Sequence, residues 1–180
     1  SMALTLEGLG ADAIGVNCSL GPKELYPIVK ELCLWTSLPV VVKPNAGLPD
    51  PVTNKYSVFP DEFAQLMKKL APLGVKIFGG CCGTSPEYIR VMRNSLSDAK
   101  CYDRTVKIPA ACCCASNTVV IDQPRVIGER INPTGKKRFK EALLAGDIDY
   151  ILGQGIEQIH AGADILDVNV GLPGIDEKSM

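Results

Sequence analysis

The chain has 180 residues, of which 46% are hydrophobic, and its 19 basic and 20 acidic side chains give a net charge of −1. This composition is typical of a globular protein and lacks the basic excess that nucleic-acid or anionic-lipid binding requires. No run of about 18 apolar residues predicts a membrane span. Together with the balanced charge, this means that neither a nucleic acid nor a membrane is an expected partner.

Cysteine is frequent, with eight residues in the chain. Small secreted proteins use such numbers as a disulfide framework, but here the spacing is irregular, with an adjacent pair at 81 and 82 and a triplet at 112–114. This pattern favours a reduced, cytoplasmic protein with a metal or reactive thiol site.

The first part of the chain alternates between predicted strands and helices. Apolar and β-branched runs predict strands at 13–17, 39–43 and 75–78. Helical periodicity predicts helices at 22–37, 60–73 and 86–96. The proline- and glycine-rich segment 44–59 is predicted as a long loop. Three strand–helix units in succession indicate a parallel α/β protein whose strands are covered on both faces.

The alternation stops at 97–123, which is predicted as a linker with one extended segment at 117–121. It then resumes with a strand at 126–130, helices at 136–145 and 148–161, and a strand at 165–170. A (β/α)8 barrel typically needs about 250 residues. We therefore expect a piece of a longer α/β protein with parts of two (β/α)8 barrels, the C-terminal portion of one at 1–96 and the N-terminal portion of the next at 124–180.

Three cysteines are predicted to meet at one edge of the sheet. Cys81 and Cys82 follow a predicted strand between glycines, which free the backbone so that neighbouring side chains can converge. Cys18 follows another strand, and the carboxyl ends of barrel strands gather on one rim. Three thiolates with one open position are typical of a catalytic zinc site. The alternative is three buried cysteines that pack as small hydrophobic side chains.

Three motifs carry a family resemblance, at residues 15–22, 44–49 and 79–87. Their order and spacing resemble the homocysteine S-methyltransferase family. The resemblance implies that Cys18, Cys81 and Cys82 bind zinc, and that the zinc takes up the homocysteine thiol. It also implies that the amide oxygen of Asn45 fills the fourth zinc position until the substrate arrives. The alternative for Asn45 is a turn-forming residue before Ala-Gly.

Two polar motifs, at 127–135 and 163–171, end the predicted strands of the second half. Asp167 and Asn169 are two apart and so share one face of a strand, where polar groups are costly unless they bind something. They suit a flat, nitrogen-rich ring, or else a polar layer satisfied inside the barrel. The motifs resemble the start of the pterin-binding domain of the cobalamin-dependent methionine synthase family, which implies that Glu129, Asn132, Asp167 and Asn169 lie at the folate end.

Together the resemblances imply a methyltransferase. A zinc-activated homocysteine thiolate would accept a methyl group and so form methionine. The methyl group would originate from 5-methyltetrahydrofolate and pass through cobalamin. The cobalamin would be bound by a module outside this chain, and no side chain is assigned as catalytic. We expect the isolated chain to be inactive, since both barrels are open. Two alternatives are a stand-alone zinc-dependent thiol methyltransferase with another donor, and a non-catalytic zinc-binding assembly piece.

The remaining cysteines and the histidine have simpler interpretations. Cys33 falls on the apolar face of a predicted helix, and the sequence predicts that Cys101 and 112–114 lie in the linker without a facing cluster. His160 is predicted to be a helix surface residue rather than a ligand.

Overall fold

The chain forms two compact units, residues 1–108 and 109–180, which are described separately. The computed structural model of the protein describes residues 1–100 and 102–180. The elements of the first unit are α1 (Met2–Gly8), β1 (Ile14–Asn17), α2 (Pro22–Leu32), β2 (Val40–Lys43), α3 (Pro60–Lys68), the 3-10 helix η1 (Ala71–Leu73), β3 (Val75–Phe78) and α4 (Pro86–Leu96).

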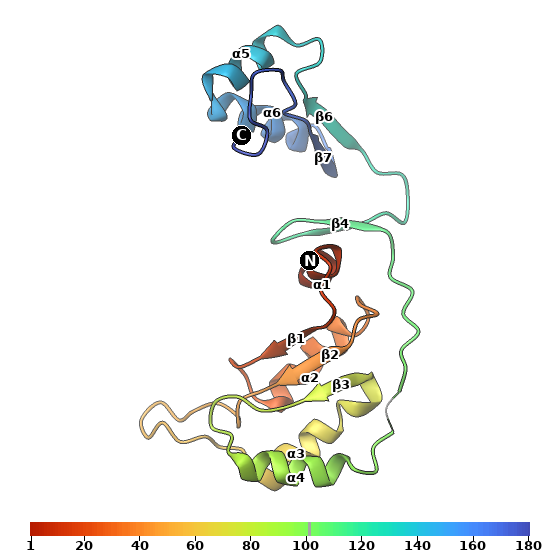
Figure 1. The fold of residues 1–180 in the computed structure, drawn as a ribbon, viewed down its shortest axis with the longest axis vertical. Helices are drawn as coiled ribbons and strands as arrows, with labels where there is room; N and C mark the ends of the chain where they lie inside the picture. The colour runs from red at the N-terminus through yellow and green to blue at the C-terminus, as the bar shows by residue number, and fades with distance from the viewer. Residues whose placement is uncertain (101) are drawn as a thin grey trace. The chain divides into compact units, whose positions relative to one another are not determined.

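The first unit is built on a parallel sheet in the order β1–β2–β3 (Figure 1). Ile14 pairs with Val40, and Val40 pairs in turn with Val75. Because all three strands run in the same direction, their carboxyl ends lie at one edge of the sheet. The loops that follow the strands therefore begin side by side.

One face of this sheet is covered by helices. Val40 and Val42 of β2 are fully buried and pack in one core with residues of α2, α3 and α4, including Val29, Phe63 and Met92. The other face of the sheet is open, so that Ile77 of β3 keeps 49% of its surface exposed. The prediction that helices cover both faces of the sheet is therefore wrong for one face.

The helix boundaries differ from the sequence prediction in three places. The short helix α1 was not predicted, and α2 ends at Leu32 instead of continuing to residue 37. The helix predicted at 60–73 divides into α3 and η1. Pro72 explains the division, because proline has no N–H for the helical ladder and disfavours helical geometry in the residue before it.

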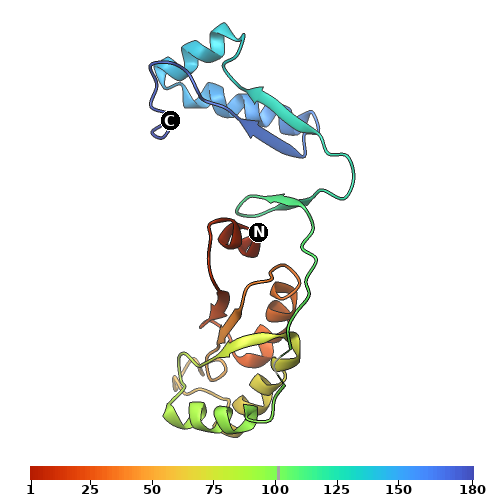
Figure 2. The same cartoon turned by 45° about the vertical axis from the view of Figure 1, so that its right-hand side comes forward.

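The second unit contains two separate pairs of strands. The elements are β4 (Ala111–Cys113), β5 (Thr118–Val120), β6 (Ile127–Ile131), α5 (Lys137–Ala145), α6 (Ile148–His160) and β7 (Ile165–Val168). β6 and β7 pair in parallel, and α6 packs along them (Figure 2). Phe139, Leu143 and Ile131 form the buried centre of this unit.

An antiparallel hairpin lies within the segment predicted as a linker. The predicted extended segment corresponds to β5, but its partner β4 was not predicted. A short run of alanine and cysteine has no periodicity that signals a strand, and β4 depends on pairing with β5 and on the Cys114 N–H bond to the carbonyl of Asn117 at 2.9 Å. The mixed α/β class is confirmed. In the described residues, no helix has the length and apolar character needed to cross a lipid bilayer.

Candidate metal centre

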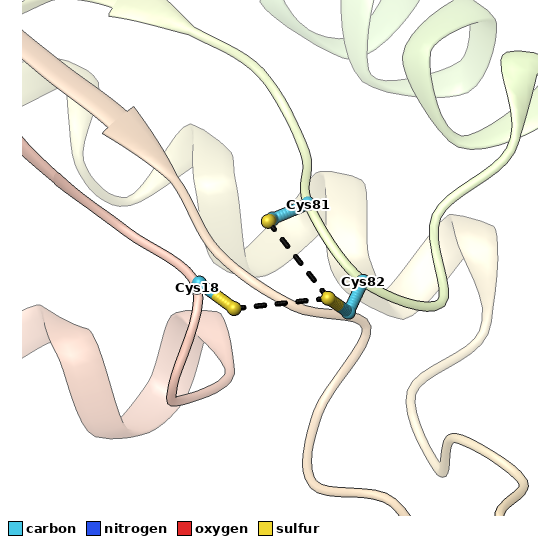
Figure 3. A group of neighbouring side chains, drawn as sticks. All are labelled: Cys18, Cys81 and Cys82. Atoms are coloured by element: carbon cyan, nitrogen blue, oxygen red, sulfur yellow. Dashed lines mark hydrogen bonds between the residues drawn. The ribbon is translucent and has the colours of Figure 1, made fainter.

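Cys18 is the first residue after β1. Its N–H donates a hydrogen bond of 3.0 Å to the carbonyl of Lys43, the last residue of β2. Cys18 and Ser19 both adopt the left-handed backbone conformation, with φ of 60° and 61°. This conformation costs a non-glycine residue about 1–2 kcal/mol. The bend turns the chain at the sheet edge, and the sulfur of Cys18 points toward the loop after β3 (Figure 3).

Cys81 and Cys82 lie in a tight turn after β3. The N–H of Cys81 donates to the carbonyl of Pro44 at 2.8 Å. Thr84 donates twice to the carbonyl of Cys81, from its N–H at 3.1 Å and from its hydroxyl at 2.6 Å. Gly83 closes the turn with φ of 76°, which glycine adopts without strain. The turn brings the two neighbouring sulfurs to within 4.0 Å of each other.

The three sulfurs form one group. Cys18 Sγ lies 3.7 Å from Cys82 Sγ, and all three sulfurs lie within 4.8 Å of one another (Figure 3). Thiolates bound to a tetrahedral zinc at about 2.3 Å lie roughly 3.8 Å apart. The donor set and its spacing therefore fit zinc with little movement. That these residues bind zinc stays a prediction.

The sulfurs differ in their electrostatic surroundings. The backbone N–H of Ser19 lowers the pKa of the Cys18 thiol most, and the thiols of Cys82 and Cys81 lower it further by donating hydrogen bonds. The same hydrogen bonds, with Cys18 as the first partner, raise the pKa of Cys82. In the metal-free group, these hydrogen bonds favour the thiolate of Cys18 over the thiolate of Cys82.

Asn45 joins the two cysteine loops. It is 5% exposed, and its side-chain oxygen accepts a hydrogen bond from the N–H of Cys82 at 3.1 Å. Its side chain also contributes to lowering the pKa of Cys18, after the N–H of Ser19 and the other two thiols. The oxygen predicted as the fourth zinc ligand thus already accepts one hydrogen bond. A carbonyl oxygen has a second lone pair, so direct ligation stays a prediction.

Tyr56 is a neighbour of the site that the sequence did not indicate. Desolvation raises the pKa of the Tyr56 hydroxyl, and the charge of Cys82 and its hydrogen bond to Tyr56 raise it further. The residue lies in the loop predicted at 44–59, where a single tyrosine among polar and turn residues carries no recognisable signal. Only the folded loop brings it to the sulfurs.

The predicted folate residues lie at the carboxyl ends of β6 and β7. Glu129 is exposed and lies 3.6 Å from Lys136 in an ion pair. The side-chain oxygen of Asn132 accepts a hydrogen bond from Thr134 N–H at 2.9 Å.

Asp167 and Asn169 are both exposed, and Asn169 follows β7 instead of lying within it. The side-chain oxygen of Asn169 accepts from Gly171 N–H at 2.8 Å, while its own N–H donates to the carbonyl of Ile131 at 2.8 Å. Parallel pairing thus places Asn169 beside the end of β6. The role of these four residues in folate binding stays a prediction.

The other cysteines and the histidine take no part in the sulfur group. Cys33 is buried, and this burial raises the pKa of its thiol. His160 is exposed, and Cys101 lies outside the described residues. Within residues 1–100 and 102–180, Cys18, Cys81 and Cys82 form the only group of three His, Cys, Asp or Glu side chains close enough to share a metal ion.

The sequence is similar to those of two named bacterial proteins. It is 36% identical to methionine synthase of Mycobacterium tuberculosis, in an alignment that covers 97% of this chain and 15% of the relative. It is also 36% identical to methionine synthase of Mycobacterium leprae, over 94% of this chain and 15% of the relative. The chain therefore spans about 15% of the length of these relatives.

A solved structure and a family of sequences are also similar to this chain. The metallated form of the homocysteine methyltransferase MmuM from Escherichia coli is 26% identical, with a TM-score of 0.41, over 51% of this chain and 27% of that one. Residues 1–96, more than half of the chain and the part that holds all three sulfurs, match the homocysteine S-methyltransferase family. The chain belongs to the homocysteine S-methyltransferase family.

Proposed function

We propose that this chain is part of a methionine synthase and that its first unit holds the zinc ion that activates homocysteine. The observation that carries the proposal is the approach of Cys18, Cys81 and Cys82 to within 4.8 Å of one another at the carboxyl edge of a parallel sheet. Family membership and the methionine synthase relatives support homocysteine as the substrate of this group. In this proposal, residues 1–96 are the C-terminal part of a homocysteine-binding barrel.

The residues of the site have distinct tasks in this reaction. Cys18, Cys81 and Cys82 would hold the metal as thiolates, and Asn45 fixes the turn that carries Cys82. A bound zinc ion supplies acidity, because a thiol coordinated to it loses its proton near neutral pH. The homocysteine thiolate then attacks the methyl carbon of the donor in a nucleophilic displacement. A sulfur–carbon bond forms, the bond between the methyl group and the donor breaks, and the donor keeps the electron pair.

The second unit fits the methyl-donor side of the same reaction. Residues 124–180 would be the N-terminal part of a pterin-binding barrel, and 97–123 would join the two domains. Glu129, Asn132, Asp167 and Asn169 would contact the pterin of methyltetrahydrofolate, and a module elsewhere in the parent chain would carry cobalamin. In a longer chain that completes this domain, Asp167→Ala should weaken folate binding, whereas Asp149→Ala in the first turn of α6 should not.

Metal content measured with and without homocysteine tests the zinc proposal. We expect one zinc per chain, and X-ray absorption should show a rise from three to four sulfur ligands when homocysteine is added. Cys81→Ser should abolish stoichiometric zinc, and Cys112→Ser, an exposed cysteine of the other unit, should leave it unchanged. A zinc site whose ligands do not change with homocysteine would overturn the proposal.

A further inference from the structure

Tyr56 packs directly on the turn that carries Cys82. A Cβ atom added to Gly83 would lie 2.3 Å from Cγ and 2.4 Å from Cδ2 of the Tyr56 ring. The aromatic ring thus covers the Gly83 backbone at a distance that only glycine permits. Tyr56 is half-buried, although the residues on either side of it are exposed.

The loop that carries Tyr56 is held in place by hydrogen bonds at its tip. Pro49 and Tyr56 form an isolated antiparallel bridge. In the segment between these two residues, the carboxylate of Asp50 accepts hydrogen bonds from the N–H of Val52 at 3.0 Å and the N–H of Thr53 at 2.7 Å. The position of Tyr56 is therefore a property of the folded loop and not of a free side chain.

The base of the same loop is tied to the metal site. The N–H of Val58 donates to the carbonyl of Ala46 at 3.1 Å, and the N–H of Ala46 donates to the carbonyl of Cys82 at 2.9 Å. The hydroxyl of Tyr88 also donates to the carbonyl of Val58 at 2.9 Å. The Cys82 turn is thus held by Ala46 and Asn45 on one side and covered by the Tyr56 ring at Gly83.

We propose that Tyr56 is a positioning residue of the sulfur site, whose ring fixes the Cys82–Gly83 turn and thereby the position of the Cys82 sulfur. This inference rests on the proposed zinc function. Residues that orient metal ligands in this way typically contribute 10–100-fold to metal affinity.

The ring contact can be tested separately from the phenol oxygen. The contact with the Gly83 backbone involves the ring carbons of Tyr56. Tyr56→Phe therefore keeps this contact, whereas Tyr56→Leu removes the flat ring.

Cobalt titration of the chain tests the inference, because Co²⁺ bound by thiolates gives visible and near-ultraviolet charge-transfer bands. We expect wild type and both variants to bind one Co²⁺. Tyr56→Leu should bind it about 10-fold more weakly. Tyr56→Phe, which keeps the ring, should bind it with the wild-type affinity. Tyr102→Leu, which removes the ring of a 51% exposed tyrosine of the same unit, is the matched control and should leave the affinity unchanged.

The outcomes separate the two proposals. If wild type binds Co²⁺ with thiolate bands and Tyr56→Leu gives the same affinity, the role of Tyr56 is overturned while the metal site stands. If wild type binds no Co²⁺ through thiolates, both proposals are overturned. A loss of affinity in Tyr56→Phe as large as that in Tyr56→Leu contradicts the role of the ring, since Tyr56→Phe keeps it. Circular dichroism of each variant establishes that the fold is intact.

Discussion

The N–H of Cys82 donates a hydrogen bond to the side-chain oxygen of Asn45 at 3.1 Å, across 37 positions of the sequence. The bond joins the loop after β2 to the loop after β3, and Asn45 is almost fully buried when it makes it. A buried side-chain oxygen without a donor is costly, so this contact stabilises the fold as well as orienting a proposed metal ligand.

Asn45→Ala should lower the free energy of unfolding of the first unit by about 0.5–1.5 kcal/mol, because it removes the hydrogen bond between the Asn45 side chain and the N–H of Cys82. It should also weaken zinc binding, since the Cys82 turn loses one of its supports. Urea denaturation and a chelator competition measure the two effects. Asn94→Ala, at an exposed position of α4, is the control and should change neither. Equal stability of the two variants would contradict the role given to Asn45.

Gly83→Ala should be more harmful than Gly10→Ala. Both glycines have positive φ, 76° and 83°, so alanine meets backbone strain of about 1–2 kcal/mol at either position. Only at Gly83 does the new methyl group also meet the Tyr56 ring, because nothing lies within 4 Å of a Cβ at Gly10. We expect thermal denaturation to show a larger loss for Gly83→Ala and chelator competition to show weaker zinc binding for that variant alone. Identical zinc affinity in the two variants would show that the ring contact does not support the site.

The tip of the Tyr56 loop should loosen in acid. The N–H of Thr53, its hydroxyl and the N–H of Val52 all lower the pKa of Asp50. A carboxyl with a lowered pKa in the folded state stabilises the loop above its unfolded pKa of about 3.9, and this stabilisation is lost as the pH falls through the folded value. The amide resonance of Thr53, followed by NMR from pH 6 downward, should move only below about pH 4. Asp50→Asn should abolish that titration, and a Thr53 shift that persists in this variant would rule out Asp50 as its source.

Phe139→Ala should affect the second unit alone. Phe139 is only 1% exposed at the centre of that unit. Truncating such a side chain to alanine lowers the free energy of unfolding by about 3–5 kcal/mol. Because residues 1–108 form a separate compact unit, we expect hydrogen exchange to accelerate in α5, α6 and β6 but not in β1 to β3. Zinc affinity should stay at its wild-type value. Faster exchange around Cys18 would mean that the two units unfold together.

The sequence predicted the parts of the fold that depend on local patterns. Helical periodicity and β-branched runs found the parallel strands β1 to β3, and from those strands the meeting of Cys18 with Cys81 and Cys82 could be predicted. The order of strands and loops was sufficient for this prediction, because the carboxyl ends of parallel strands lie at one edge of the sheet whatever the exact bounds of the helices.

The contacts that depend on tertiary structure could not be predicted. The left-handed backbone at Cys18 and Ser19 is imposed by the loop around it, since neither residue type favours that conformation. Tyr56 reaches the sulfurs only because its loop is bonded to Ala46 and closed by Asp50. Strand β4 exists only as the partner of β5. In each case the local conformation depends on a contact with residues of another segment, which the sequence pattern of the segment itself does not show.

The short distances between the sulfurs also have a consequence for redox chemistry. Cys18 Sγ and Cys82 Sγ are 3.7 Å apart in the reduced chain, and a disulfide requires them to approach to about 2.05 Å. A peroxide-type oxidant converts the thiolate of such a pair to a sulfenic acid, and the neighbouring thiol then displaces its oxygen as water to form the disulfide. The Cys18 pKa is the lowered one of the two. The geometry that suits a metal therefore leaves the metal-free chain open to oxidation, so that an ion bound by these thiolates also protects them.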